Sequence, residues 1–231
     1  CVEVRVLGVC SAVMPRREST SAARAVPPLR IRFAGPAGDA PRLLLAHGAG
    51  AGMDSEFMSA VARGLGALGV RVARFEFEYM ARRRTGVRPP PDRLPRLFAR
   101  FRAAAERVGP LDQLVIGGKS MGGRIASMLA DELGVKGVLC LGYPFHPPTK
   151  LEQTRTQHLS SLRSPCLIVQ GTRDPFGTRE EVAGYALSRS ICLEWIEDGD
   201  HDLQPRRRSG FDPEAARQQL LLAAASFVRS L

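Results

Sequence analysis

Two kinds of chemistry share one short stretch of the sequence, VIGGKSMGG at residues 115–123. Read as G-K-S, it belongs to a phosphate-binding loop, in which backbone N–H groups and a lysine hold the phosphates of a nucleotide. Read as G-x-S-x-G, it is a nucleophile elbow, in which a serine sits on a tight turn between a strand and a helix. The neighbouring residues decide between the two.

The spacing excludes the phosphate loop. Its G-x-x-x-x-G-K-[ST] pattern requires a glycine at position 113, where the chain has Gln113. Residues 114–116 are Leu-Val-Ile, which predict a strand and leave no room for a loop around a phosphate. Gly118 and Gly122 flank Ser120 at positions where side chains would collide as the strand and the helix close on each other. The sequence therefore predicts Ser120 as a nucleophile.

A serine nucleophile needs an acid and a histidine base, which follow it along the chain in the order Asp or Glu, then His. Among the four histidines, His201 in EDGDHDL is the one that can follow an acid placed on a later strand. Asp174 lies three residues after Gly171, just past the apolar run PCLIVQG. The predicted catalytic residues are thus Ser120, Asp174 and His201. The carboxylates closest to the histidine in sequence are interpreted as loop and turn residues: Asp198, Asp200 and Asp202.

An oxyanion hole needs two backbone N–H groups directed at one oxygen. Met121, directly after the nucleophile, is expected to supply one of them. The small residues of LLLAHGAGAGMDS allow the backbone to approach a substrate, and Ala49 is the predicted second donor, with Gly50 as the alternative.

Three further residues are candidates for substrate binding, and each has a structural alternative. His47 either lines the site or holds the glycine-rich loop by hydrogen bonds. His146, in YPFHPP, either lines the pocket or is an ordinary loop histidine. Lys119 either attracts an anionic substrate or forms an ion pair.

Strand-like and helical patterns alternate along the chain and would position these residues. Strands are predicted over 42–48, 70–77 and 111–118, and in VKGVLCLG, PCLIVQG and ICLEWIE; helices are predicted over 54–68, 92–108, 121–134 and 212–231. The alternation favours an α/β fold with a mostly parallel central sheet and helices on both faces. The short connection between Tyr143 and Cys166 leaves no room for a large cap domain. We expect a loose N-terminal extension over 1–28 and one domain over 29–231.

Composition narrows the possible functions. No apolar run approaches the ~18 residues of a membrane span, so no membrane association is predicted. The net charge is +10, but the clusters 82–84 and 206–208 lack the interleaved aromatic residues of single-strand binders. They are interpreted as solvated faces, and nucleic-acid binding is not expected.

The cysteines carry no sign of metal or disulfide chemistry. They number five, and Cys140, Cys166 and Cys192 fall in apolar runs typical of buried thiols. Their spacing matches neither a zinc site nor a disulfide framework, so a reducing cytoplasm is expected.

Four separated motifs carry a resemblance to a known family: LLLAHGAGAGMDS, RFEFEYM, GGKSMGGR and LIVQGTRDPFG…GDHDL. Together they resemble a small α/β-hydrolase-like family, itself similar to dienelactone hydrolases. The family includes bacterial hydrolase-like proteins, a testis-expressed hydrolase-like protein and a subunit of the NSL histone-acetyltransferase complex. The resemblance covers residues 29–231. Glu78 departs from the pattern, which has proline at this position.

The resemblance implies an α/β-hydrolase fold and the same Ser120, Asp174 and His201 triad. The predicted triad indicates a serine hydrolase of a small to medium carboxylic ester or thioester, and no metal, nucleotide or organic cofactor is expected. Some family members act as scaffolds, so a non-catalytic interaction module is the alternative.

Overall fold

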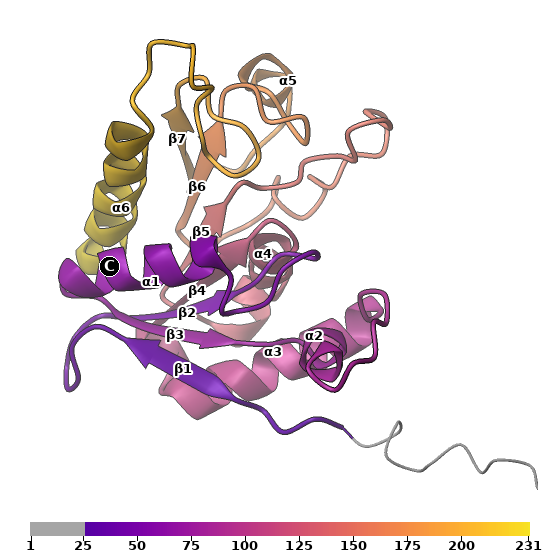
Figure 1. Cartoon of the computed structure of the whole chain (residues 1–231), viewed down its shortest axis with the longest axis vertical. Helices are drawn as coiled ribbons and strands as arrows, with labels where there is room; N and C mark the ends of the chain where they lie inside the picture. Colours follow the sequence, from indigo (N-terminus) through magenta and orange to yellow (C-terminus); the bar gives the residue numbers. More distant parts are fainter. Residues whose placement is uncertain (1–25) are drawn as a thin grey trace, which may run out of the picture.

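A computed structural model describes residues 26–231, and Figure 1 shows their arrangement. Most of the predicted N-terminal extension therefore lies outside the described residues. The strands are β1 (Ile31–Ala34), β2 (Arg42–Ala46), β3 (Arg71–Phe75), β4 (Leu114–Lys119), β5 (Gly137–Leu141), β6 (Cys166–Gly171) and β7 (Ile191–Ile196). The helices are α1 (Glu56–Ala67), α2 (Glu78–Arg83), α3 (Leu94–Val108), α4 (Met121–Leu133), α5 (Arg179–Ala183) and α6 (Pro213–Ser230).

The strands form one sheet in the order β1-β3-β2-β4-β5-β6-β7. β1 is antiparallel to β3, and all the other neighbours are parallel. Every residue of β4, β5 and β6 is buried, which explains their near-continuous apolar sequences, because helices cover both faces of such a sheet. The predicted α/β-hydrolase fold is confirmed.

Helices cover both faces of the sheet (Figure 1), and the core lies between them and the strands. On one face, Leu65 of α1 and Leu220 of α6 pack with Val115 of β4. On the other face, Phe101 of α3 and Ile125 of α4 pack on the same sheet. The connection between β5 and β6 contains turns and no helix or strand, so within residues 26–231 no cap domain covers the sheet edge, as predicted.

The path of the chain creates a crevice at the carboxyl ends of β2 and β4. From β2 the chain runs through α1 to β3 on one side, and later returns to β4 on the other side of β2. The ends of these neighbouring strands are in register, with Ala46 opposite Gly118. Their loops leave toward opposite faces of the sheet, which is where open α/β sheets bind ligands.

Some local predictions were wrong. The strand predicted over 111–118 begins with a 3₁₀ turn, Leu111–Gln113. The short elements β1, α2 and α5 were not predicted, because four to six residues carry little periodicity. Cys140 and Cys166 are buried as expected, but Cys192, on the edge strand β7, is exposed.

None of the helices within residues 26–231 has both the length and the apolar character that crossing a bilayer would require.

Candidate active site

Ser120 occupies a strained turn at the end of β4. Its backbone has φ 51° and ψ −115°, in the left-handed region that L-residues rarely adopt, and α4 begins at the next residue. A Cβ on Gly118 would lie 2.3 Å from the carbonyl oxygen of Ala46, and one on Gly122 would lie 2.4 Å from the same atom. The two glycines therefore let the turn press against β2, as the elbow pattern requires.

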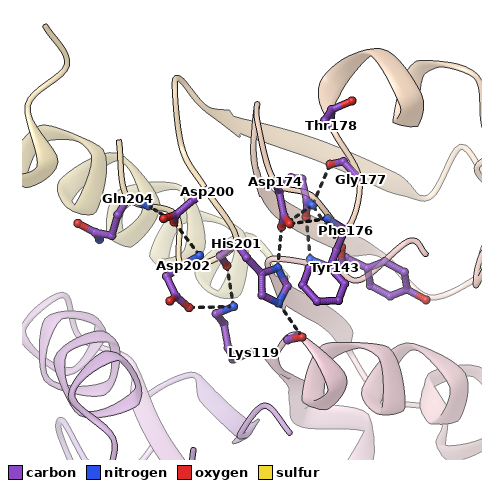
Figure 2. Close-up of polar contacts among 12 residues, drawn as sticks. Lys119, Tyr143, Asp174, Phe176, Gly177, Thr178, Asp200, His201, Asp202 and Gln204 are labelled. Carbon is purple, nitrogen blue, oxygen red and sulfur yellow. Dashed lines mark hydrogen bonds and ion pairs between the residues drawn. The ribbon is translucent and has the colours of Figure 1, made fainter. Parts of the chain in front are cut away.

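A continuous chain of hydrogen bonds joins the three predicted catalytic side chains (Figure 2). Ser120 Oγ lies 2.8 Å from His201 Nε2, and His201 Nδ1 lies 2.8 Å from Asp174 Oδ2. With Nδ1–H donating to the carboxylate, Nε2 is free to accept the proton of the serine hydroxyl. The side chains come from three different loops at the carboxyl edge of the sheet.

Asp174 is fully buried, and its carboxylate has several donors. Its Oδ1 accepts a hydrogen bond from the backbone N–H of Phe176 (2.8 Å), and its Oδ2 accepts one from Gln170 Nε2 (2.9 Å) as well as that from His201. Gln170 also exchanges hydrogen bonds with the backbone of Tyr143. Sequence reasoning missed Gln170, although a polar residue within the apolar strand LIVQG is the signal that could have revealed it.

The loop that carries His201 is held by its own carboxylates. Asp200 accepts hydrogen bonds from the N–H groups of Asp202 and Gln204. Asp198 pairs with the guanidinium of Arg206, which lowers the pKa of Asp198 to about 2. In the structure these side chains are turn residues, as expected. The ring of Phe176 lies against the His201 imidazole, with 4.2 Å between the ring centroids.

Lys119 also contacts this loop (Figure 2). Its Nζ donates to the backbone carbonyl of His201 (2.6 Å) and lies 3.4 Å from Asp202 Oδ1. Burial lowers the pKa of the ammonium, while the Asp202 carboxylate opposes that shift. Of the two alternatives, the structure shows the ion pair, with the ammonium directed at the histidine loop.

The other two candidate binding residues are fully buried and do not line the cleft beside Ser120. His47 donates from Nδ1 to the carbonyl of Gly48 (2.7 Å) and accepts at Nε2 from the N–H of Phe77 (3.2 Å), so it holds the loop after β2. Its burial lowers its pKa. His146 lies 3.2 Å from Glu181 Oε2 and joins the loop after β5 to α5. In the structure, His47 therefore holds the glycine-rich loop and His146 is a loop histidine, and neither lines the cleft.

The prediction that the arginine cluster at residues 82–84 is a solvated face was wrong for Arg84. Arg84 binds the buried Glu76 with two hydrogen bonds of 2.8 Å and also pairs with Asp54. Tyr79 Oη, nearby, donates to the carbonyls of Gly48 (3.2 Å) and Ala49 (3.0 Å). These residues therefore anchor the loop that carries the predicted oxyanion donors.

A second serine and histidine pair lies away from this site. Ser127 Oγ is 2.9 Å from His158 Nε2. The hydroxyl donates to the carbonyl of Arg124 in its own helix, and burial lowers the pKa of His158 to about 4. No carboxylate among the described residues hydrogen-bonds to His158, so the pair lacks the acid of a triad.

A cleft of about 850 Å³ opens beside the serine. Ser120 and His201 form part of its wall, together with the backbone of Gly48, Ala49 and Gly50. The N–H of Met121 belongs to the first turn of α4, where amide groups have no partner within the helix. Ala49 and Gly50 thus line the same cleft as Ser120, and Met121 directly follows Ser120 in the chain.

Comparison with solved structures gives the same architecture. XC6422 from Xanthomonas campestris, described as an α/β serine hydrolase without a lid, is 21% identical, with a TM-score of 0.66 over 89% of this chain and 90% of that chain. Dienelactone hydrolase from Anabaena variabilis is 22% identical, with a TM-score of 0.64 over 87% and 91%. Est1E from Butyrivibrio proteoclasticus is 14% identical, with a TM-score of 0.63 over 87% and 95%.

A sequence profile of the α/β-hydrolase domain matches residues 39–229, which is most of the chain. The match includes all three residues of the hydrogen-bonded chain at the sheet edge. The chain therefore belongs to the α/β-hydrolase domain family.

Proposed function

We propose that the protein is a serine hydrolase that cleaves a small to medium carboxylic ester or thioester through an acyl-enzyme. The observation that carries the proposal is the hydrogen-bond chain from Ser120 through His201 to the buried Asp174, with 2.8 Å at each step. Neighbours described as a serine hydrolase and as dienelactone hydrolase support it by analogy of fold.

In the proposed reaction, His201 Nε2 takes the proton of Ser120 as Oγ attacks the acyl carbon. The carbonyl electrons move onto oxygen, and the N–H groups of Met121 and of Ala49, or alternatively Gly50, stabilise the resulting oxyanion. Collapse breaks the bond to the leaving alkoxide or thiolate, which receives the proton from Nε2. A water then repeats the sequence and releases the acid, while Asp174 keeps the imidazole oriented throughout.

A fluorophosphonate probe tests this proposal directly, because it phosphonylates activated serines. We expect the wild type to be labelled and Ser120→Ala to be unlabelled. Asp174→Asn should lower kcat on an activated ester by about 10⁴, because the imidazole loses its orienting carboxylate. Ser127→Ala is the matched control, since it removes the other serine that contacts a histidine, and it should label normally. Absence of labelling in well-folded wild type would overturn the proposal.

A further inference from the structure

The cleft beside Ser120 runs between α1 and α6. From α1 it is lined by Phe57, Ala60 and Val61, which share one face because they are three and four residues apart. From α6 it is lined by Arg217 and Leu220, again three residues apart. One face of each helix is therefore turned toward the space next to the nucleophile.

A close contact between the same helices bounds this cleft. A Cβ on Gly64 would lie 2.5 Å from Leu221 Cδ1, so the absence of a side chain lets α6 approach α1 there. Gly64 lies about one helical turn beyond Ala60, while Phe57 lies near Lys119 and the nucleophile. The helices therefore meet at Gly64 and leave space on the side toward Ser120.

The wall between the helices is apolar. Met58, Val61, Leu203 and Leu220 border the cleft from the core, each at most 4% exposed, and the partly exposed Ala60 contributes surface to its wall. Phe57 adds a partly exposed ring. Burying each methylene of a ligand against such a wall is worth up to about a fourfold gain in binding.

Both cations that line the cleft already have polar partners. Lys119 is bound by the His201 carbonyl and Asp202, and Arg217 pairs with Glu214. Glu56, which also lines the cleft, forms no ion pair with any residue in the range 26–231. A ligand with a terminal carboxylate would therefore meet two acidic side chains and two cations that already have partners.

We infer that this cleft binds the uncharged acyl chain of a medium-chain ester, with its carbonyl at Ser120 and its alkyl part between α1 and α6. This inference rests on the proposed serine hydrolase function. It assigns the acyl group, which the triad by itself leaves open.

Chain length and tail charge test the inference. With p-nitrophenyl esters, kcat/KM should rise at least about tenfold from acetyl to hexanoyl, as methylenes enter the apolar wall. The p-nitrophenyl monoester of adipic acid has the same six-carbon chain with a terminal carboxylate, and its kcat/KM should be at least about tenfold below that of the hexanoyl ester. Equal rates for acetyl and hexanoyl esters, or a preference for the adipic monoester, would contradict the inference.

A substitution in α1 tests where the acyl chain of the substrate binds. Ala60→Trp places an indole in the cleft and should lower the hexanoyl-to-acetyl ratio of kcat/KM at least about tenfold. Ala67→Trp makes the same change at an exposed residue of the same helix that does not line the cleft, and should leave both rates unchanged. Ala60→Leu is a smaller step, expected to shift the ratio in the same direction if tryptophan disturbs folding. An unchanged ratio in folded Ala60 variants would overturn the location.

A binding measurement separates this inference from the proposed function. In Ser120→Ala, which cannot form an acyl-enzyme, calorimetry should show tighter binding of p-nitrophenyl hexanoate than of p-nitrophenyl acetate. Ala60→Trp in the same background should remove the difference. Wild type that neither labels nor turns over esters would refute the hydrolase, whereas equal binding of the two esters would refute the acyl cleft alone.

Discussion

Ser120 and Lys119 are neighbours in the chain that contact two different parts of one histidine. The hydroxyl of Ser120 meets the imidazole of His201, and the ammonium of Lys119 meets its backbone carbonyl. The ring and the main chain of His201 are thus both tied to the end of β4. Lys119 touches no reacting atom in the proposed mechanism, so we regard it as a positioning residue.

Replacing Lys119 should therefore impair catalysis more than binding. Lys119→Met keeps the length of the side chain but loses both polar contacts, so the His201 loop can shift relative to Ser120. We expect kcat to fall by about ten- to a hundredfold, the cost of a small misplacement of a catalytic group, with KM within about twofold. Steady-state kinetics and the rate of fluorophosphonate labelling measure this, with the exposed Lys136→Met as the control. A change confined to KM would instead indicate direct substrate contact.

The three residues that the structure joins by hydrogen bonds at the candidate site could be predicted from the sequence because the elbow motif is local. The glycines around Ser120 form a recognisable pattern that marks its strained backbone. The order of serine, acid and histidine along the chain then selects Asp174 as the acid and His201 as the base. Gln170 and the direction of Lys119 could not be predicted in this way. Their contacts join loops that are far apart in sequence and meet only when the sheet has formed.

Among the elements, the segment after β3 determines the shape of the loop after β2. Residues 78–83 of this segment form α2, whose Tyr79 contacts that loop. Glu78 is the first residue of α2, a position where proline is favoured because its missing N–H has no partner there in any case. Glutamate also suits a helix N-terminus, which explains why the departure from the family pattern leaves the element intact.

Removing one hydroxyl should test this coupling between elements. Tyr79→Phe deletes the donor to the carbonyls of Gly48 and Ala49, and so frees the peptide groups next to the predicted oxyanion donor. We expect the free energy of unfolding to fall by about 0.5–1.5 kcal/mol, and kcat to fall by up to about tenfold. Chemical denaturation and ester kinetics provide the two measurements. Tyr185→Phe, whose ring stacks on Phe145 away from that loop, is the matched control and should retain kcat.

For the molecule as a whole, the net charge of +10 does not reveal that some of its arginines form ion pairs inside the structure. Arg84 and Arg206 each bind carboxylates that hold the loops beside Ser120. A second class of titratable group is partly buried and has no charged partner within residues 26–231, and His158 is the clearest example. Such a group makes stability depend on pH even though it lies outside the site.

The sign of this dependence follows from the pKa of His158. An imidazole in the unfolded chain has a pKa near 6.5, whereas burial lowers the pKa of His158 to about 4. Between these values the unfolded state binds a proton that the folded state does not. The His158 contribution is therefore complete above about pH 6.5 and is lost as the pH falls toward about 4.

We expect His158→Gln, which can still hydrogen-bond to Ser127, to flatten the fall in stability over that window. Urea unfolding of wild type and variant at several pH values between about 4 and 7 measures it. Parallel curves for the two proteins would show that other groups cause the dependence.

The open edge of the sheet has a consequence for the timing of turnover. Because the connection between β5 and β6 forms no cap, no segment within residues 26–231 has to swing aside to open the cleft beside Ser120. In enzymes with mobile lids, opening or product release often limits kcat. Here the slow step should be a chemical one, either acylation or hydrolysis of the acyl-enzyme. The value of kcat would then depend on the chemical nature of the leaving group or of the acyl group, and it would not change with the viscosity of the medium.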